Sequence, residues 1–317
     1  VLAYLTRRHE TEVPLEHIVH LGGLVPALSL AGRAFAEPGD TLMTCTPVYP
    51  PFLGIHRDGK LDLIKIPHVL ESGRWSFDWD AMEEAVTPKT RIFVLSNPQN
   101  PLGRVFSENE LIQLAEFCDR HDLTLISDEI HCDLIFDEQA TPFFSALRLP
   151  GALAKRTITL LSPSKTYNIA GLGYAYAVIP DDARRRRFNH ARGHTLAEIN
   201  CLAYYAAEAA YNHGESWRLK LLAYLQGNRD LLTSFCRNEL RGVTIPNLEA
   251  TYLAWLDFRP AGIREPAHLF ERNADLFLSD GRIFGEPGHA RLNFGCARSL
   301  LQQALEAMRS VLSKHPA

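Results

Sequence analysis

A lysine closely follows a strand-like segment in LLSPSKTYNIAGLG, the stretch from Leu160 to Gly173. Lysines are usually solvated, but Lys165 comes after the apolar run TITLL and behind two serines that flank a proline. In a partly apolar pocket, a lysine amine loses proton affinity and becomes a nucleophile that can form a Schiff base with an aldehyde. Lys165 is therefore the candidate residue for covalent chemistry.

The segment ISDEIHCD offers a second chemical group, the carboxylate of Asp128. Such acids are most often solvated at the start of a loop or helix. A metal site could use Asp128, His131 and Asp133, but the sequence has no partner cluster elsewhere, and we predict no metal. A third interpretation places Asp128 at the end of a buried strand, where it would keep a cationic ring nitrogen protonated. A ring nitrogen and an aldehyde together describe pyridoxal 5'-phosphate (PLP).

A phosphate site is suggested by LGGLVPALSLAGRAF, in which Gly22 and Gly23 precede a helical run that we expect to begin at Pro26. The start of a helix presents free N–H groups and favours anions. A Gly-Gly turn before a helix is more often only a turn. The hydroxyls of Ser162 and Ser164 could bind the same phosphate. The sequence contains no GxxxxGK[ST] motif, which excludes a nucleotide P-loop.

Tyr49, in TPVYPPF, offers a flat aromatic face that could stack on a pyridine ring. A tyrosine flanked by proline is more often plain packing. Together, however, the groups in these segments would fit one ligand that has a phosphate, an aldehyde, an aromatic ring and a ring nitrogen. PLP has all four.

The elements that must position these residues alternate short apolar runs with amphipathic stretches, which predicts an α/β sheet flanked by helices. We expect buried strands at 91–98, 123–129, 157–162 and 174–180, covered on both faces. Polar residues follow several of these strands: Asn97 and Asn100, Asp128, and Ser162 with Ser164. Ligands of open α/β sheets bind at the carboxyl ends of the strands, so these segments point to one site.

Helix signals complete the outline. Ser107 and Glu110 form a capping-box pattern that predicts a helix through ELIQLAEFCDRH. The pattern is helical from Leu196 to Leu240, and the remainder, 241–317, mixes strand-like ATYLAWLDF and ARLNFGCA with helices. We predict a large domain at 1–216 and a small C-terminal α+β domain at 217–317.

Composition excludes several classes of partner. The 317 residues are 46% hydrophobic and 22% charged, with net charge −4, which gives no general attraction to nucleic acid or anionic lipid. The basic run RRRR at 184–187 is flanked by aspartates and is typical of a solvated helix face. We expect no membrane span and no signal peptide at Val1. Six scattered cysteines suit a reducing compartment, and we predict a cytoplasmic protein.

At this point the chain resembles a known family, the fold type I PLP-dependent enzymes of the class I/II aminotransferase superfamily. Within them it is most similar to the cystathionine β-lyase (MalY/PatB) C–S lyases. The resemblance spans the whole chain, in family order and spacing: VPALSLAGRAF, TPVYPPF, SNPQNPLGRVFSENEL, LISDEIHCDLIF, LLSPSKTYNIAGLG and ARLNFGCAR. It implies a PLP-dependent transferase-like α/β large domain with a mixed, mostly parallel sheet and a smaller C-terminal α+β domain.

The resemblance also implies residue roles. Lys165 matches the lysine that forms the Schiff base with PLP, and Asp128 matches the partner of the pyridine nitrogen. The other cofactor contacts implied are Asn100 and His131 near the ring oxygen, Tyr49 stacked on the ring, and Gly23, Leu24, Val25, Ser162 and Ser164 around the phosphate. Arg291 is similar to the arginine that binds the substrate carboxylate, a task that suits a bidentate guanidinium.

The function implied is β-elimination from cystathionine or a related cysteine S-conjugate, giving a thiol, pyruvate and ammonia. Two alternatives stay open: an aminotransferase that uses the same residues, and a non-catalytic regulatory or interaction protein that keeps the fold. The resemblance further implies a homodimer with the active site at the interface. Relatives carry several dozen residues before the position of Val1, so we expect the N-terminal part of the small domain to be missing.

Overall fold

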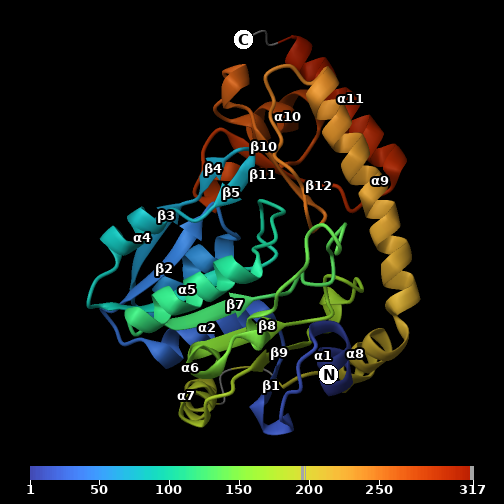
Figure 1. Cartoon of the computed structure of the whole chain (residues 1–317). Coiled ribbons are helices and arrows are strands. Elements are labelled where there is room, and N and C mark those ends of the chain that lie inside the picture. Colours follow the sequence, from blue (N-terminus) through green and yellow to red (C-terminus); the bar gives the residue numbers. More distant parts are fainter. Residues whose placement is uncertain (194–195, 197, 315–317) are drawn as a thin grey trace.

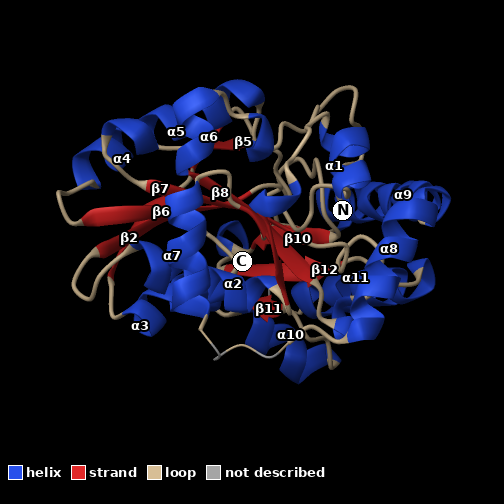
Figure 2. Cartoon of the chain, turned by 90° about the horizontal axis from the view of Figure 1, so that it is seen from below, coloured by secondary structure: helices blue, strands red, loops and turns tan. Residues whose placement is uncertain are grey.

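The computed structural model describes residues 1–193, 196 and 198–314. Within them, a seven-stranded sheet has the order β1-β9-β8-β7-β6-β2-β3 (Figures 1 and 2). Its strands are β1 (Ile18–Leu21), β2 (Thr41–Thr46), β3 (Asp62–Pro67), β6 (Thr90–Ser96), β7 (Thr124–Asp128), β8 (Thr157–Leu161) and β9 (Ala175–Val178). The pairs from β8 to β3 are parallel, whereas β9 is antiparallel to β8 and to β1. The predicted mixed, mostly parallel sheet is confirmed.

Helices cover both faces of this sheet. Figure 2 shows α4 (Trp79–Ala85), α5 (Glu108–Arg120) and α6 (Gly151–Arg156) on one side, and α2 (Leu24–Phe35), α3 (Ile55–Gly59) and α7 (Asp182–Arg192) on the other. Successive residues of β7 point into different cores, because Leu125 packs with Leu114 of α5 and Ile126 with Leu28 of α2. Both faces of the sheet are therefore buried, as the nearly continuous apolar runs predicted.

A smaller antiparallel sheet lies above the large one in Figure 1, with the order β10-β12-β11. Its strands are β10 (Leu253–Asp257), β11 (Ser279–Asp280) and β12 (His289–Asn293). It packs with α9 (Glu215–Glu239), α10 (Pro266–Ala274) and α11 (Arg298–Ser313) around a core of its own that contains Leu232, Phe270 and Leu305. The domain boundary after residue 216 falls in the first turn of α9 and stays a prediction.

The remaining elements connect these layers. They are α1 (Leu2–His9), α8 (Cys201–His213), the hairpin β4 (Val69–Glu71) with β5 (Arg74–Ser76), and short 3₁₀ turns at 15–17, 50–54, 146–148, 170–172, 259–261 and 281–284. Within the part of the chain that the structure describes, no helix is long and apolar enough to cross a bilayer.

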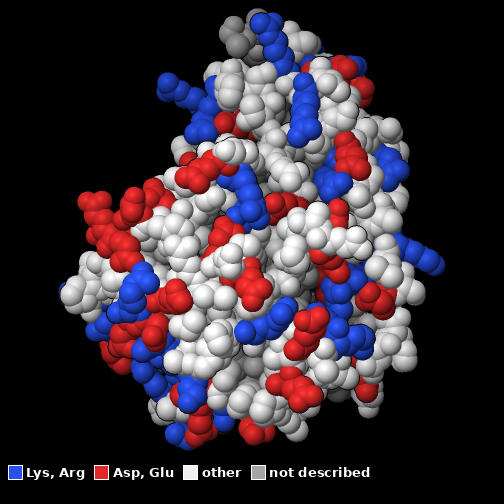
Figure 3. Space-filling view, viewed as in Figure 1, with Lys and Arg blue, Asp and Glu red and all other residues white. Residues whose placement is uncertain are grey.

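Local signals account for several helix boundaries. The capping box of α5 is present, since Ser107 accepts from the N–H of Glu110 and the Glu110 carboxylate accepts from Ser107. The arginine run lies on α7, where Arg185 and Arg186 pair with Asp182. Acidic and basic side chains are likewise interspersed over the face shown in Figure 3. This mixture favours a solvated surface over a nucleic-acid site.

Two boundary predictions are wrong. The helix expected to begin at Pro26 begins at Leu24, so the proline occupies the third position, where a missing N–H costs no intrahelical hydrogen bond. The helical stretch expected from Leu196 begins at Cys201 and is interrupted at Gly214 between α8 and α9. Residue 197 of that stretch lies outside the described residues.

Candidate active site

The site lies at the edge of the large sheet where the parallel strands end. The chain leaves β6 after Ser96, β7 after Asp128 and β8 just before Ser162, all at this edge. Strand β1 ends there too, and it leads through the two glycines into α2. Since β9 runs the other way, its first residues also reach this edge, next to Tyr174. Topology alone thus brings five chain segments together.

A cavity of about 370 Å³ opens at this edge. All eleven residues predicted from the sequence line it: Gly23, Leu24, Val25, Tyr49, Asn100, Asp128, His131, Ser162, Ser164, Lys165 and Arg291. They come from segments up to 268 residues apart, so their convergence is a property of the fold. Their individual roles stay predictions.

Asp128 is buried at the end of β7, and its Oδ1 accepts a hydrogen bond of 3.0 Å from the N–H of Ile130. Burial raises the pKa of this carboxyl to about 7, while the bond from Ile130 and the charge of Lys165 act to lower it. A cation placed beside Asp128 would favour its ionised form. The half-buried amine of Lys165 lines the same cavity.

His131 is also buried, and its Nδ1 has no hydrogen-bond partner among the residues described. Burial lowers the pKa of its imidazole to about 3, and the nearby positive charges of Lys165 and Arg291 lower it further. The ring is therefore neutral at physiological pH and keeps one nitrogen free for a ligand. Tyr252 packs edge-on against it, with 5.9 Å between the ring centroids.

Arg291 reaches the cavity from β12, the middle strand of the small sheet. Its Nη1 donates to Asn100 Oδ1 at 2.9 Å and its Nη2 to Ser279 Oγ at 3.3 Å. Its guanidinium lies 4.8 Å from the centroid of the Phe284 ring. The Nε is buried without a partner in the described chain, and burial lowers the pKa of the guanidinium. Such a group is arranged to bind an anion.

The comparison with known protein families identifies the family of the chain that forms this cavity. Residues 1–308 match the family described as aminotransferase class I and II. The chain belongs to this family.

Individual relatives and solved structures are also similar to this chain over most of its length. Cystathionine beta-lyase PatB of Bacillus subtilis (strain 168) is 35% identical over 321 residues, covering 99% of this chain and 82% of PatB. A crystal structure named OvoB superposes with a TM-score of 0.95 at 37% identity, covering 98% and 82% of the two chains. Cystalysin from Treponema denticola, described as containing PLP, gives 0.93 at 29% identity, covering 99% and 80%. The family prediction is confirmed, and the PLP prediction agrees with cystalysin.

The cavity of this aminotransferase family member has the polar groups that PLP requires. The first N–H groups of α2, at Leu24 and Val25, have no intrahelical partner and suit a phosphate. Asp128 suits the ring nitrogen, Lys165 the aldehyde, and the free Nδ1 of His131 a polar ring substituent. The residues present therefore fit the group.

The Ser162 hydroxyl already has hydrogen-bond partners within the chain. Its hydroxyl already donates to the main-chain oxygen of Tyr174 at 2.6 Å, and it accepts from the N–H of Ser164 at 3.1 Å. The hydroxyl proton thus ties the end of β8 to the start of β9. We propose that Ser162 holds the loop in shape and that Ser164, which also lines the cavity, is the better phosphate donor.

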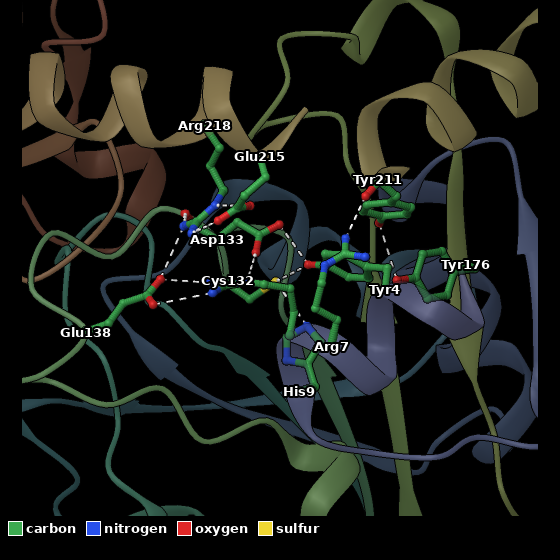
Figure 4. A network of polar contacts seen from close by, with 11 residues as sticks. Tyr4, Arg7, His9, Cys132, Asp133, Glu138, Tyr176, Tyr211, Glu215 and Arg218 are labelled. Carbon is green, nitrogen blue, oxygen red and sulfur yellow. Dashed lines mark hydrogen bonds and ion pairs between the residues drawn. The ribbon is translucent and has the colours of Figure 1, made fainter. Parts of the chain in front are cut away.

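Sequence reasoning missed a buried network that fixes the loop after β7 (Figure 4). Asp133 Oδ2 accepts from the Tyr4 hydroxyl at 2.7 Å, and its Oδ1 from Arg8 Nε at 3.1 Å. Arg218, in the first turn of α9, donates to the main-chain oxygen of Asp133 at 3.0 Å and pairs with Glu215. These contacts hold the loop only two residues beyond His131, but nothing in the local pattern reveals partners about 85 and 130 positions away.

Tyr252 and Asn293 also line the cavity and were not predicted. They flank the start of β10 and the end of β12, which pair with Leu253 opposite Asn293. The sequence indicated both strands but not this register. An aromatic residue at the start of the strand that pairs with the Arg291 strand is the signal that could have found Tyr252.

Proposed function

We propose that this chain is a PLP-dependent carbon–sulfur β-lyase. Its reaction would convert a cysteine S-conjugate, such as cystathionine, and one water into a thiol, pyruvate and ammonia. The observation that carries the proposal is the convergence of the Lys165 amine, the Asp128 carboxylate and the Arg291 guanidinium on one cavity. The 35% identity to a relative named cystathionine beta-lyase supports this choice of reaction.

The substrate carboxylate binds Arg291, whose Nη1 is already held by Asn100 and so loses little freedom on binding. Because Lys165 lines the same cavity, the substrate Cα would then lie within its reach. PLP, when bound, supplies a ring that accepts the electrons left at Cα when its proton is removed. The Asp128 carboxylate would pair with the ring nitrogen and favour its positively charged form, which would strengthen that electron withdrawal.

Lys165, which lines the cavity, would hold the cofactor through its Nζ in the resting protein. Once it is free, this Nζ removes the Cα proton as a general base. Once the Cβ–S bond breaks, the sulfur carries the bonding electron pair, and the protonated Lys165 can return a proton to it. The neutral ring of His131, enclosed beside Lys165, orients the site without adding a competing positive charge.

The test is to supply the protein with PLP, add cystathionine, and measure thiol and pyruvate. We expect both products in equal amounts, and neither from Lys165→Ala. Lys155→Ala, which changes an exposed lysine on α6, is the matched control and should retain activity. Conversion of PLP to its amine form, with an oxo-acid requirement and no thiol, would show the aminotransferase alternative instead.

We also propose that the chain works as a homodimer with the cavity at the interface. Apolar side chains are exposed around the cavity and along α8: Val25 at 42%, Leu172 at 38%, Leu202 at 61% and Tyr205 at 70%. The turn at 170–172 contacts α8, which places Leu172 beside that helix, and exposed apolar groups of this kind are typical of an interface. All six cysteines are free thiols, which supports the proposal of a reducing, cytoplasmic location.

A further inference from the structure

A second cavity of about 530 Å³ adjoins the first. We call it the α9 cavity, because Trp217, Leu221, Tyr224 and Leu225 of helix α9 form one wall. The two cavities share Lys165, Tyr252 and Asn293 as lining residues. Lys165 thus lines both cavities, and Arg291 lines the first of them.

The wall of the α9 cavity is a single helix face. Its four residues follow the spacing i, i+4, i+7 and i+8, which places them on one side of α9. Trp217 is 45% exposed and Tyr224 is 43% exposed, so two aromatic side chains leave apolar surface open to the space. Tyr167, two residues after Lys165, lies against Trp217 with 6.1 Å between ring centroids. This contact links the aromatic wall to the lysine loop.

The charges of the α9 cavity are as informative as its apolar surface. Among the described residues that line it, Lys165 alone carries a charge. Arg298 lies nearby, but its Nε donates to Asn228 at 3.0 Å and its guanidinium lies 4.8 Å from the Tyr224 ring centroid. An ammonium on a ligand here would find no carboxylate among the described residues that line the cavity, and it would meet the positive charge of Lys165.

We propose that the α9 cavity binds the sulfur substituent of the substrate and that it selects uncharged aryl or alkyl groups. This inference rests on the proposed lyase function. With the carboxylate on Arg291 and Cα at Lys165, the substituent beyond Cβ can extend into this space, because Lys165 lines both cavities. Cavities of about 150 Å³ already hold benzene, so a benzyl group fits with room to spare. Cystathionine, whose leaving group carries both an ammonium and a carboxylate, is the poorer substrate.

The test compares three substrates on the PLP-loaded enzyme: S-benzyl-cysteine, S-methyl-cysteine and cystathionine. We expect the highest kcat/KM for S-benzyl-cysteine. Trp217→Ala should lower that value about 10- to 100-fold, the range for losing one good apolar contact, and change S-methyl-cysteine less than about threefold. Leu219→Ala, an exposed α9 leucine that does not line the cavity, is the matched control and should change none of the three.

An equal loss with all three substrates would show that Trp217 only maintains the fold, and the inference would be wrong. It would also be wrong if wild-type enzyme preferred cystathionine and Trp217→Ala kept that order. Binding of S-benzyl-cysteine to PLP-loaded Lys165→Ala, with and without Trp217→Ala, separates the two proposals. Tryptophan-dependent binding without cleavage by the wild type would overturn the lyase function but leave the cavity assignment standing.

Discussion

Asp128 is expected to destabilise the cofactor-free protein, and its removal should make that protein more stable at neutral pH. Burial raises the pKa of the Asp128 carboxyl from its usual 3.8 to about 7. At about 1.4 kcal/mol for each tenfold change in proton affinity, the ionised form costs the folded state about 4 kcal/mol above pH 7. Below pH 3.8 the carboxyl is protonated in both folded and unfolded chains, and the cost disappears.

Because the folded-state pKa is the higher one, the folded chain binds the proton more tightly, and stability falls as pH rises from about 4 to 7. Asp128→Asn cannot ionise, and its side-chain oxygen can still accept from Ile130. We therefore compare the free energy of unfolding of the variant with that of wild type at each pH. The difference in favour of the variant should increase by about 2–3 kcal/mol as the pH rises from 5 to 8. Glu129, whose pKa burial also raises to about 7, is present in both proteins.

The assay is urea unfolding of both cofactor-free proteins at several pH values, with Asp62→Asn as the control at an exposed position. A stability difference that stays constant from pH 5 to 8, or that shrinks, would refute the reasoning. The same variant should lose activity, and PLP should stabilise it less than it stabilises wild type, since the ring nitrogen then lacks its carboxylate partner. Stability and function are thus opposed at this residue.

Three further predictions concern the scaffold, and urea unfolding measures each. Gly103→Ala should lower the free energy of unfolding by about 2–4 kcal/mol, because φ is +67° and a Cβ would lie 2.9 Å from Leu248 Cδ2. Gly73→Ala is the control: its φ is +77° but the space around it is open, so it should cost only about 1 kcal/mol. Tyr4→Phe removes a donor to the buried Asp133 and should cost about 1–3 kcal/mol. Ser107→Ala breaks the capping box and should cost about 1 kcal/mol.

The part of the site that sequence could predict is the part written in local signals. An apolar run followed by a polar residue identifies a buried strand and its end, so Asp128 and Ser162 could be placed at the sheet edge before any pairing was known. The glycines before α2 and the capping box of α5 are equally local. Arg291 was different: only the family resemblance indicated it, since an arginine in a strand is usually a surface residue.

What the sequence could not supply is pairing over long distances. The register that sets Leu253 opposite Asn293 brings Tyr252 to the cavity, and one residue of slip would turn it to the other face. Likewise, Tyr4 and Asp133 are ordinary residues in their own segments and become a buried pair only when α1 packs on the loop after β7. These contacts depend on the packing of whole elements, which no window of sequence contains.

The first turn of helix α9 contributes both to the buried network around Asp133 and to the wall of the α9 cavity. Arg218 is 2% exposed and binds the loop that follows His131, whereas its neighbour Trp217 lines the α9 cavity. Adjacent residues on a helix point in directions about 100° apart, so anchoring Arg218 fixes where Trp217 points. The network in Figure 4 therefore constrains the direction of Trp217 in the aromatic wall as well as the position of the loop after β7. A change at Asp133 or Arg218 should alter the preference among sulfur substituents, although neither residue lines either cavity.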